Sequence, residues 1–222
     1  LVVYDVAKLL DNLFRGDRRI GNDKEFSKKV VLVDENEMTA VMMGFPTLKG
    51  LSRETPSTYV SVLLNQNAAL HYIDVAQEFG LAGDVCPMPE AELGVSIDDD
   101  APILGACAVQ CNTTCDGSLM GNGIEARSFK IPTFQLAVPI RHRQESVQEY
   151  AAEEVVNAIH FIEEQTGEKF NWDAFFKSMK RFNAETEEFL EWMEISKTDY
   201  PQVMGVTLAL YRYGVYQAAG GR

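Results

Sequence analysis

The chain has 222 residues, of which 46% are hydrophobic and 24% charged, and its formal net charge is −13. This length allows one large domain or two small ones, and no apolar run is long enough to cross a bilayer. The negative field would repel nucleic acid, and no cluster of lysine and arginine offsets it. We therefore expect neither a nucleic-acid partner nor a membrane partner.

The ends of the sequence bear on location and completeness. Leu1 opens a segment without the basic, apolar and small-residue pattern of a signal peptide, which favours a cytoplasmic location. The last residues, Gly220-Gly221-Arg222, are typical of a loop. We expect the chain to be an N-terminal portion of a longer protein.

The sequence up to about residue 140 alternates between strand-like and helix-like segments. Pro56 suits the first turn of a helix that continues at helical spacing to Phe79, where Gly80 or Gly83 would end it. Short apolar runs predict strands, and stretches rich in turn-forming or polar residues predict loops. The other expected elements are a helix at 6–12, strands at 29–33, 39–45, 103–109 and 134–138, and loops at 46–55 and 110–117.

After Pro139 the apolar residues recur at helical spacing. A helix beginning near residue 147 would end at Gly167, and a second would span 172–195 with Asn171 as its N-cap. A third helix is expected at 208–219.

This order of elements predicts the fold class and the domains. Strands alternating with helices indicate an α/β fold, in which a small parallel sheet is flanked by helices in a Rossmann- or flavodoxin-like arrangement. We expect residues 1–140 to form this domain and residues 141–222 to form a helical region that bridges to a later domain.

The four cysteines are the residues with the most specific chemistry. Without a secretory signal, ligation or burial is favoured over disulfides. Cys107 falls in a predicted strand and is interpreted as a small buried hydrophobe. Cys111 and Cys115 fall in a predicted loop, where metal ligation and a purely structural role explain them equally well. Paired C-x2-C units typical of zinc are absent, and iron–sulfur clusters tolerate ligands from several loops. Cys86 alone is a weak signal, and burial is the favoured explanation for it.

Ligands of open α/β sheets bind beyond the carboxyl ends of the strands. The loops 46–55 and 110–117 lie there, and the segment that contains Cys86 lies nearby. This geometry could bring Glu54, Cys86 and Cys115 together.

Several motifs, in order, resemble the family of 2-hydroxyacyl-CoA dehydratases and benzoyl-CoA reductases. The match covers about residues 40–195, and it is the order and spacing of the motifs that make it specific. The motifs are Glu54-Thr55-Pro56, Phe79-Gly80, Asp84-Val85-Cys86, Asn112-Thr113-Thr114-Cys115-Asp116, the stretch 131–139 (IPTFQLAVP), and the stretch 164–170 (EQTGEKF) leading into Trp172-Asp173.

The resemblance implies a [4Fe–4S] cluster held by three cysteines in each subunit. The family's first two cluster cysteines fall on Cys86 and Cys115, and the third belongs to a later α/β domain. Either this chain is truncated before that domain, or Cys111 or Cys107 substitutes for the third ligand. Members are homo- or heterodimers of related subunits, and a separate ATP-dependent iron–sulfur activator supplies one electron. In the dehydratases, this electron converts a coenzyme A thioester into a ketyl radical that expels a hydroxyl group.

The resemblance also assigns roles near the substrate. Glu54 is implied as a general base or hydrogen-bonding anchor, although a carboxylate favoured by a helix start explains it equally well. Ser52 and Arg53 would approach the thioester or the coenzyme A phosphates. From the residues alone, Arg141 belongs to a short basic group around His142 after a strand end, which either meets these phosphates or, as we favour, is solvated.

Three functions remain open at this point. The first is the iron–sulfur subunit of a 2-hydroxyacyl-CoA dehydratase, a lyase. The second is a reductase subunit of the same family, similar to benzoyl-CoA reductase or to a double-cubane-cluster protein, which the extra Cys107 and Cys111 favour. The third is a cluster-free subunit that serves only interaction.

Overall fold

The computed structural model describes residues 24–33, 35–52, 66–98, 105–112, 116–139, 143–144 and 146–200. The helices predicted at 6–12 and 208–219 lie outside the described residues. Among the helices that are described, none is long and apolar enough to cross a membrane.

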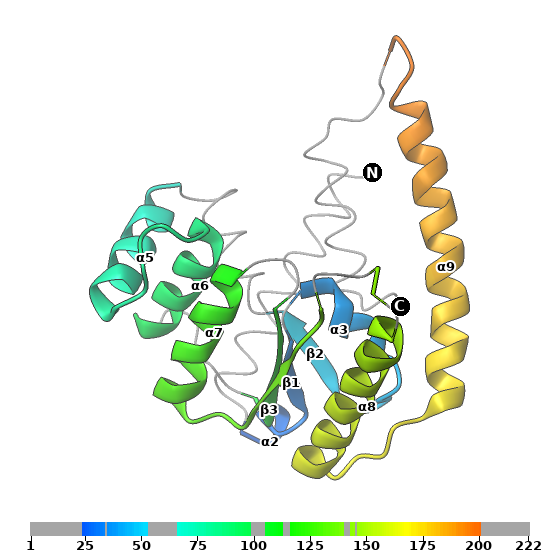
Figure 1. The fold of residues 1–222 in the computed structure, drawn as a ribbon, viewed down its shortest axis with the longest axis horizontal. Coiled ribbons are helices and arrows are strands. Elements are labelled where there is room, and N and C mark those ends of the chain that lie inside the picture. The colour runs from blue at the N-terminus through cyan, green and yellow to red at the C-terminus, as the bar shows by residue number, and fades with distance from the viewer. Residues whose placement is uncertain are drawn as a thin grey trace.

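A four-stranded, all-parallel sheet forms the centre of the fold and confirms the predicted α/β class (Figure 1). The strand order is β2-β1-β3-β4. β1 is an uninterrupted apolar run because both of its faces are covered. The strands are β1 (Val30–Val33), β2 (Lys49–Ser52), β3 (Cys107–Cys111) and β4 (Thr133–Leu136).

Helices cover both faces of the sheet. One face packs with α3 and α8 in the main hydrophobic core, and α7 lies on the other face with α6 and α5 stacked beyond it (Figure 1). The helices are α2 (Lys24–Ser27), α3 (Glu35–Met42), α5 (Gln66–Phe79), α6 (Pro87–Ile97), α7 (Asp116–Phe129), α8 (Val147–Thr166) and α9 (Trp172–Ile195).

Two predictions in the first half of the chain were wrong. Residues 39–45 lie in and just after α3 rather than in a strand, because the buried side chains of Met38, Val41, Met42 and Phe45 follow helical spacing. The predicted loop 46–55 contains β2, a short edge strand whose sequence KGLS has no apolar pattern to reveal it.

The predicted helices after residue 146 are confirmed. Gly167 ends α8 with a left-handed backbone (φ 75°), and its N–H donates to the carbonyl of Glu163 at 2.8 Å. Asn171 caps α9, since its side-chain oxygen accepts from the N–H of Ala174 at 2.9 Å. α8 packs on β3 and β4, whereas the division of the chain at residue 140 stays a prediction.

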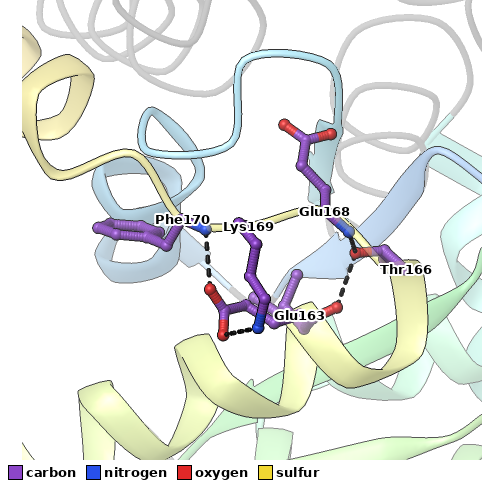
Figure 2. Close-up of polar contacts among 6 residues, drawn as sticks. Glu163, Thr166, Glu168, Lys169 and Phe170 are labelled. Carbon is purple, nitrogen blue, oxygen red and sulfur yellow. Dashed lines mark hydrogen bonds and ion pairs between the residues drawn. The ribbon is translucent and has the colours of Figure 1, made fainter.

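The turn between α8 and α9 is held by a network of hydrogen bonds (Figure 2). Glu163 accepts from the backbone N–H of Phe170 at 2.9 Å and from the Lys169 ammonium at 3.1 Å. The Thr166 hydroxyl donates to the carbonyl of Ile162 at 2.7 Å and accepts from the N–H of Glu168 at 3.3 Å. The motif that resembled the family's junction is therefore a local structural unit.

The same turn is fastened to the loop between α3 and β2. The Glu168 carboxylate accepts from both the N–H and the hydroxyl of Thr47. The N–H of Asn171 donates to the carbonyl of Gly44 at 2.8 Å, and the Phe170 ring stacks edge-on against Phe45. These contacts fix the direction in which α9 leaves the domain.

Candidate functional site

The carboxyl ends of the strands form the edge at which a sheet of this order binds ligands. β1 lies between β2 and β3, so the direction of winding reverses between β1 and β3. Val33 pairs with Ser52 of β2 and with Val109 of β3. β3 then continues to Cys111, beside Leu136 of β4.

Three of these strand ends lead into predicted site residues. Arg53 and Glu54 follow β2, Cys115 follows β3, and Arg141 follows β4. Because all four strands are parallel, these segments leave the same edge of the sheet. These four residues and the side chain of Ser52 lie outside the described part of the chain, so their roles stay predictions.

Cys86 is an exposed thiol at the start of α6. It occupies the N-cap position with an extended backbone (φ −62°, ψ 133°), and Pro87 follows in the first turn, where its fixed φ is favourable. Val85 packs against a buried cluster that includes Leu81 and Leu93. The residue before the thiol is therefore anchored while the thiol itself faces solvent.

α6 and α7 pack against each other and run in the same direction. Near the start of the contact, a methyl group added at Gly121 of α7 would lie 3.6 Å from the Pro89 Cβ of α6. One turn further along each helix, Ile124 packs against the cluster that contains Leu93. Both helices thus begin at the same end of their contact.

This packing relates the two predicted cluster cysteines. Cys86 directly precedes α6, and Cys115 directly precedes α7. Met88, in the first turn of α6, and Met120, in the second turn of α7, are 40% and 44% exposed.

The other two described cysteines belong to the core. Cys107 and Cys111 are fully buried in β3, and both contribute to the core cluster packed with α3 and α8. Burial raises the pKa of the Cys107 thiol to about 12, which disfavours the thiolate that ligation needs. The predicted loop 110–117 was therefore wrong at its start, because the strand continues through Cys111.

Cys111 is not brought together with Cys86. Side chains alternate between the two faces of a strand, so Cys111 and its neighbour Gln110 point to opposite faces. The Gln110 amide donates to the Asn122 carbonyl of α7 at 3.4 Å, which places it on the α7 face. The Cys111 side chain lies on the other face, that of α8.

Asn112 links the ends of β3 and β4. Its amide donates to the carbonyl of Val138 at 3.0 Å, and its side-chain oxygen accepts from the N–H of Val138 at 2.7 Å. This reciprocal pair fixes the backbone three residues before Cys115. The sequence showed Asn112 as part of a motif but gave no role for it.

Asn112→Ala is expected to lower the free energy of unfolding by about 1–2 kcal/mol, because two backbone groups of Val138 lose their partner. Chemical denaturation followed by circular dichroism measures the change. Gln148→Ala, on the exposed side of α8, is the matched control and should leave stability unchanged. Equal loss in both variants would show that the Asn112 link does not hold the strand ends.

A stripe of buried polar residues on α7 also escaped the sequence analysis. Ser118, Asn122 and Glu125 recur at i, i+4 and i+7, and all three are almost fully buried. The available signal was this polar periodicity, which apolar patterns overlook. It adds buried polar side chains to the α7 side of the sheet, where Val30, Leu32 and Ala108 form a small apolar cluster.

The described residues do not complete a metal site by themselves. Among them, no group of three or more His, Cys, Asp and Glu side chains is placed to hold a metal ion. Of the three described cysteines, Cys86 is the one that is exposed. Cys115 lies outside the described residues, so its predicted role as a ligand stays a prediction.

The sequence profile of the family described as 2-hydroxyglutaryl-CoA dehydratase, D-component, matches residues 38–219. The chain belongs to this family. The family is a dehydratase component, which confirms the resemblance identified from the motifs and relates the chain to a hydro-lyase. No curated protein matches the chain closely.

Proposed function

We propose that this chain is the iron–sulfur subunit of a 2-hydroxyacyl-CoA dehydratase, which eliminates water from an (R)-2-hydroxyacyl-CoA. Membership of the dehydratase-component family supports the reaction class. The observation that carries the iron–sulfur role is the position of Cys86. It is an exposed thiol at the start of α6, which packs beside the helix that Cys115 directly precedes.

Cys86 and Cys115 would be two of the ligands of a [4Fe–4S] cluster. Cys111, the alternative third ligand, would have to leave the core on the α8 face. We therefore favour a third ligand from outside the described residues. When bound, the cluster would supply single electrons to the thioester and an open iron position.

The remaining site residues would act on the substrate at the same edge of the sheet. Glu54 would serve as a base or anchor and Ser52 would lie close to the thioester, while Arg53 and Arg141 would pair with the coenzyme A phosphates. Local cations are needed because the chain carries a net charge of −13. The proposed partners are a homologous second subunit and an ATP-dependent iron–sulfur activator.

Anaerobic purification of the protein with its partner subunit, followed by iron and sulfide analysis and electron paramagnetic resonance, tests the cluster. We expect Cys86→Ser and Cys115→Ser to lose most of the bound iron, because each removes a thiolate ligand. Cys107→Ala is the matched control and should retain the iron, since its thiol is buried in the core. Iron content unchanged by Cys86→Ser, or absent from the wild type, would contradict the proposal.

A further inference from the structure

The long helix α9 has its charges sorted by sign along its length. Apart from Asp173 in its first turn, the first half of α9 carries basic side chains, and its second half carries acidic ones. The basic residues are Lys177, Lys180 and Arg181, and the acidic ones are Glu185, Glu187, Glu188, Glu191 and Glu194. This order opposes the helix dipole, which favours acidic residues near the start of a helix and basic residues near its end.

The charges on the outer side of α9 are not balanced within the described chain. Arg181 pairs with Glu185 at 3.6 Å, whereas Lys177, Lys180, Glu187 and Glu191 have no ion pair among the described residues. Lys177 and Lys180 are three residues apart, and Glu187 and Glu191 are four apart. Like charges at these spacings repel each other on a helix. A partner with the opposite order of charges would relieve both repulsions.

Apolar side chains flank these charges at both ends of the helix. Phe176 and Leu190 are each 56% exposed, and Trp172 and Met193 are 47% and 41% exposed. No residue of α9 is fully buried. In Figure 1 the helix runs along one side of the α/β domain and extends past the sheet.

We propose that α9 pairs in antiparallel orientation with α9 of a second copy of this chain. If Lys180 lies opposite Glu187 of the partner copy, the same alignment places Lys177 near Glu191 and Phe176 near Leu190. It also places Asp173 near Glu194, whose charge is already balanced by Lys197 of its own chain. A parallel pair would set like charges against each other. The antiparallel pair is self-complementary, so the charge pattern fits a second copy of this helix.

This pairing would place the contact to a second subunit on α9. The inference uses only the side chains of α9, and it does not rest on the proposed iron–sulfur role. Oligomeric state and iron content are separate measurements, so either idea can fail while the other stands. The contacts that hold the α8–α9 turn to the Gly44–Thr47 loop fasten the start of α9 to the rest of the same chain.

Sedimentation velocity across a wide range of protein concentrations tests the pairing. The wild type is expected to reach twice the mass of the chain and to dissociate as the salt concentration rises. Two charge-reversal variants, K177E/K180E and E187K/E191K, should each raise the dissociation constant by roughly tenfold or more. An equimolar mixture of the two variants should restore the dimer, because the reversed charges again match.

Circular dichroism checks that both variants remain helical. The reversal D74K/E78K on the exposed side of α5 is the matched control and should leave the dissociation constant unchanged. A wild type that stays monomeric throughout, or a mixture that associates no better than its separate components, would overturn the proposal. Dimerisation unaffected by either reversal would place the interface elsewhere.

Discussion

Gly94→Ala is expected to lower the free energy of unfolding by about 3 kcal/mol. The added Cβ would lie 1.9 Å from the carbonyl oxygen of Tyr72 in α5, far inside any permitted contact. This oxygen belongs to the backbone of a helix, so relief requires α5 and α6 to move apart. Overpacking of this kind typically costs 1–3 kcal/mol, and backbone contacts are the least able to relax. Denaturant unfolding followed by circular dichroism measures the loss.

Gly123→Ala is the matched control for this prediction. Gly123 is an exposed glycine in α7, and an added Cβ there would meet nothing within 4 Å. Alanine favours a helix over glycine by about 0.5–1 kcal/mol, so stability should stay equal or rise. If the two variants unfold alike, the close approach of α5 and α6 does not exist.

The Gly94 substitution also has a functional readout. α6 begins directly after Cys86, and the α5–α6 contact helps to set the position of that helix. Displacing α6 should therefore reduce iron incorporation as well as stability, whereas Gly123→Ala should change neither adversely. Iron content that follows stability across the two variants would support the placement of Cys86 at the proposed site.

Two of the helices that the sequence did not predict, α6 and α7, have poor local signals. α6 opens with Pro87 and Pro89, which read as breakers although proline is accepted in a first helical turn. α7 contains three glycines, which lower its helix propensity. One of them, Gly121, faces Pro89 of α6, where an added Cβ would make an ordinary contact at 3.6 Å. Tertiary contacts override propensity at both helices.

The sequence could predict those parts of the candidate site that depend only on where a residue lies along the chain. Cys115 follows β3 as predicted, whereas Arg53 and Glu54 follow β2, a strand that the sequence did not predict. The roles of these residues and of Cys86 stay predictions. The burial of Cys111 could not be predicted, because its loop-like polar neighbours conceal a strand that extends under α8. The turn between α8 and α9 gave strong local signals, a glycine stop and an asparagine cap, and its bounds were predicted correctly.

Glu163→Ala is expected to lower the free energy of unfolding by about 2 kcal/mol, the second large effect. The carboxylate is mostly buried, with 15% of its side chain exposed, and it accepts a charge-assisted hydrogen bond from the Phe170 N–H. Removing it leaves that N–H without its partner and frees Lys169. The turn that holds α9 to the domain should loosen. Thermal and denaturant unfolding measure the loss, and Glu164→Ala, one residue on and exposed, is the control.

The same carboxylate should make stability depend on pH. The hydrogen bond from the Phe170 N–H, aided by Lys169, lowers the pKa of Glu163 in the folded chain below its usual value of 4.5. The unfolded chain then binds a proton more readily than the folded one, so the stabilisation is present above about pH 4.5 and is lost as the pH falls through the folded pKa. Glu163→Gln keeps an oxygen acceptor but removes the charge, so it should lose less stability than Glu163→Ala and should flatten this part of the pH profile. A profile that is identical in the wild type and in Glu163→Gln would show that the charge on Glu163 does not hold the turn.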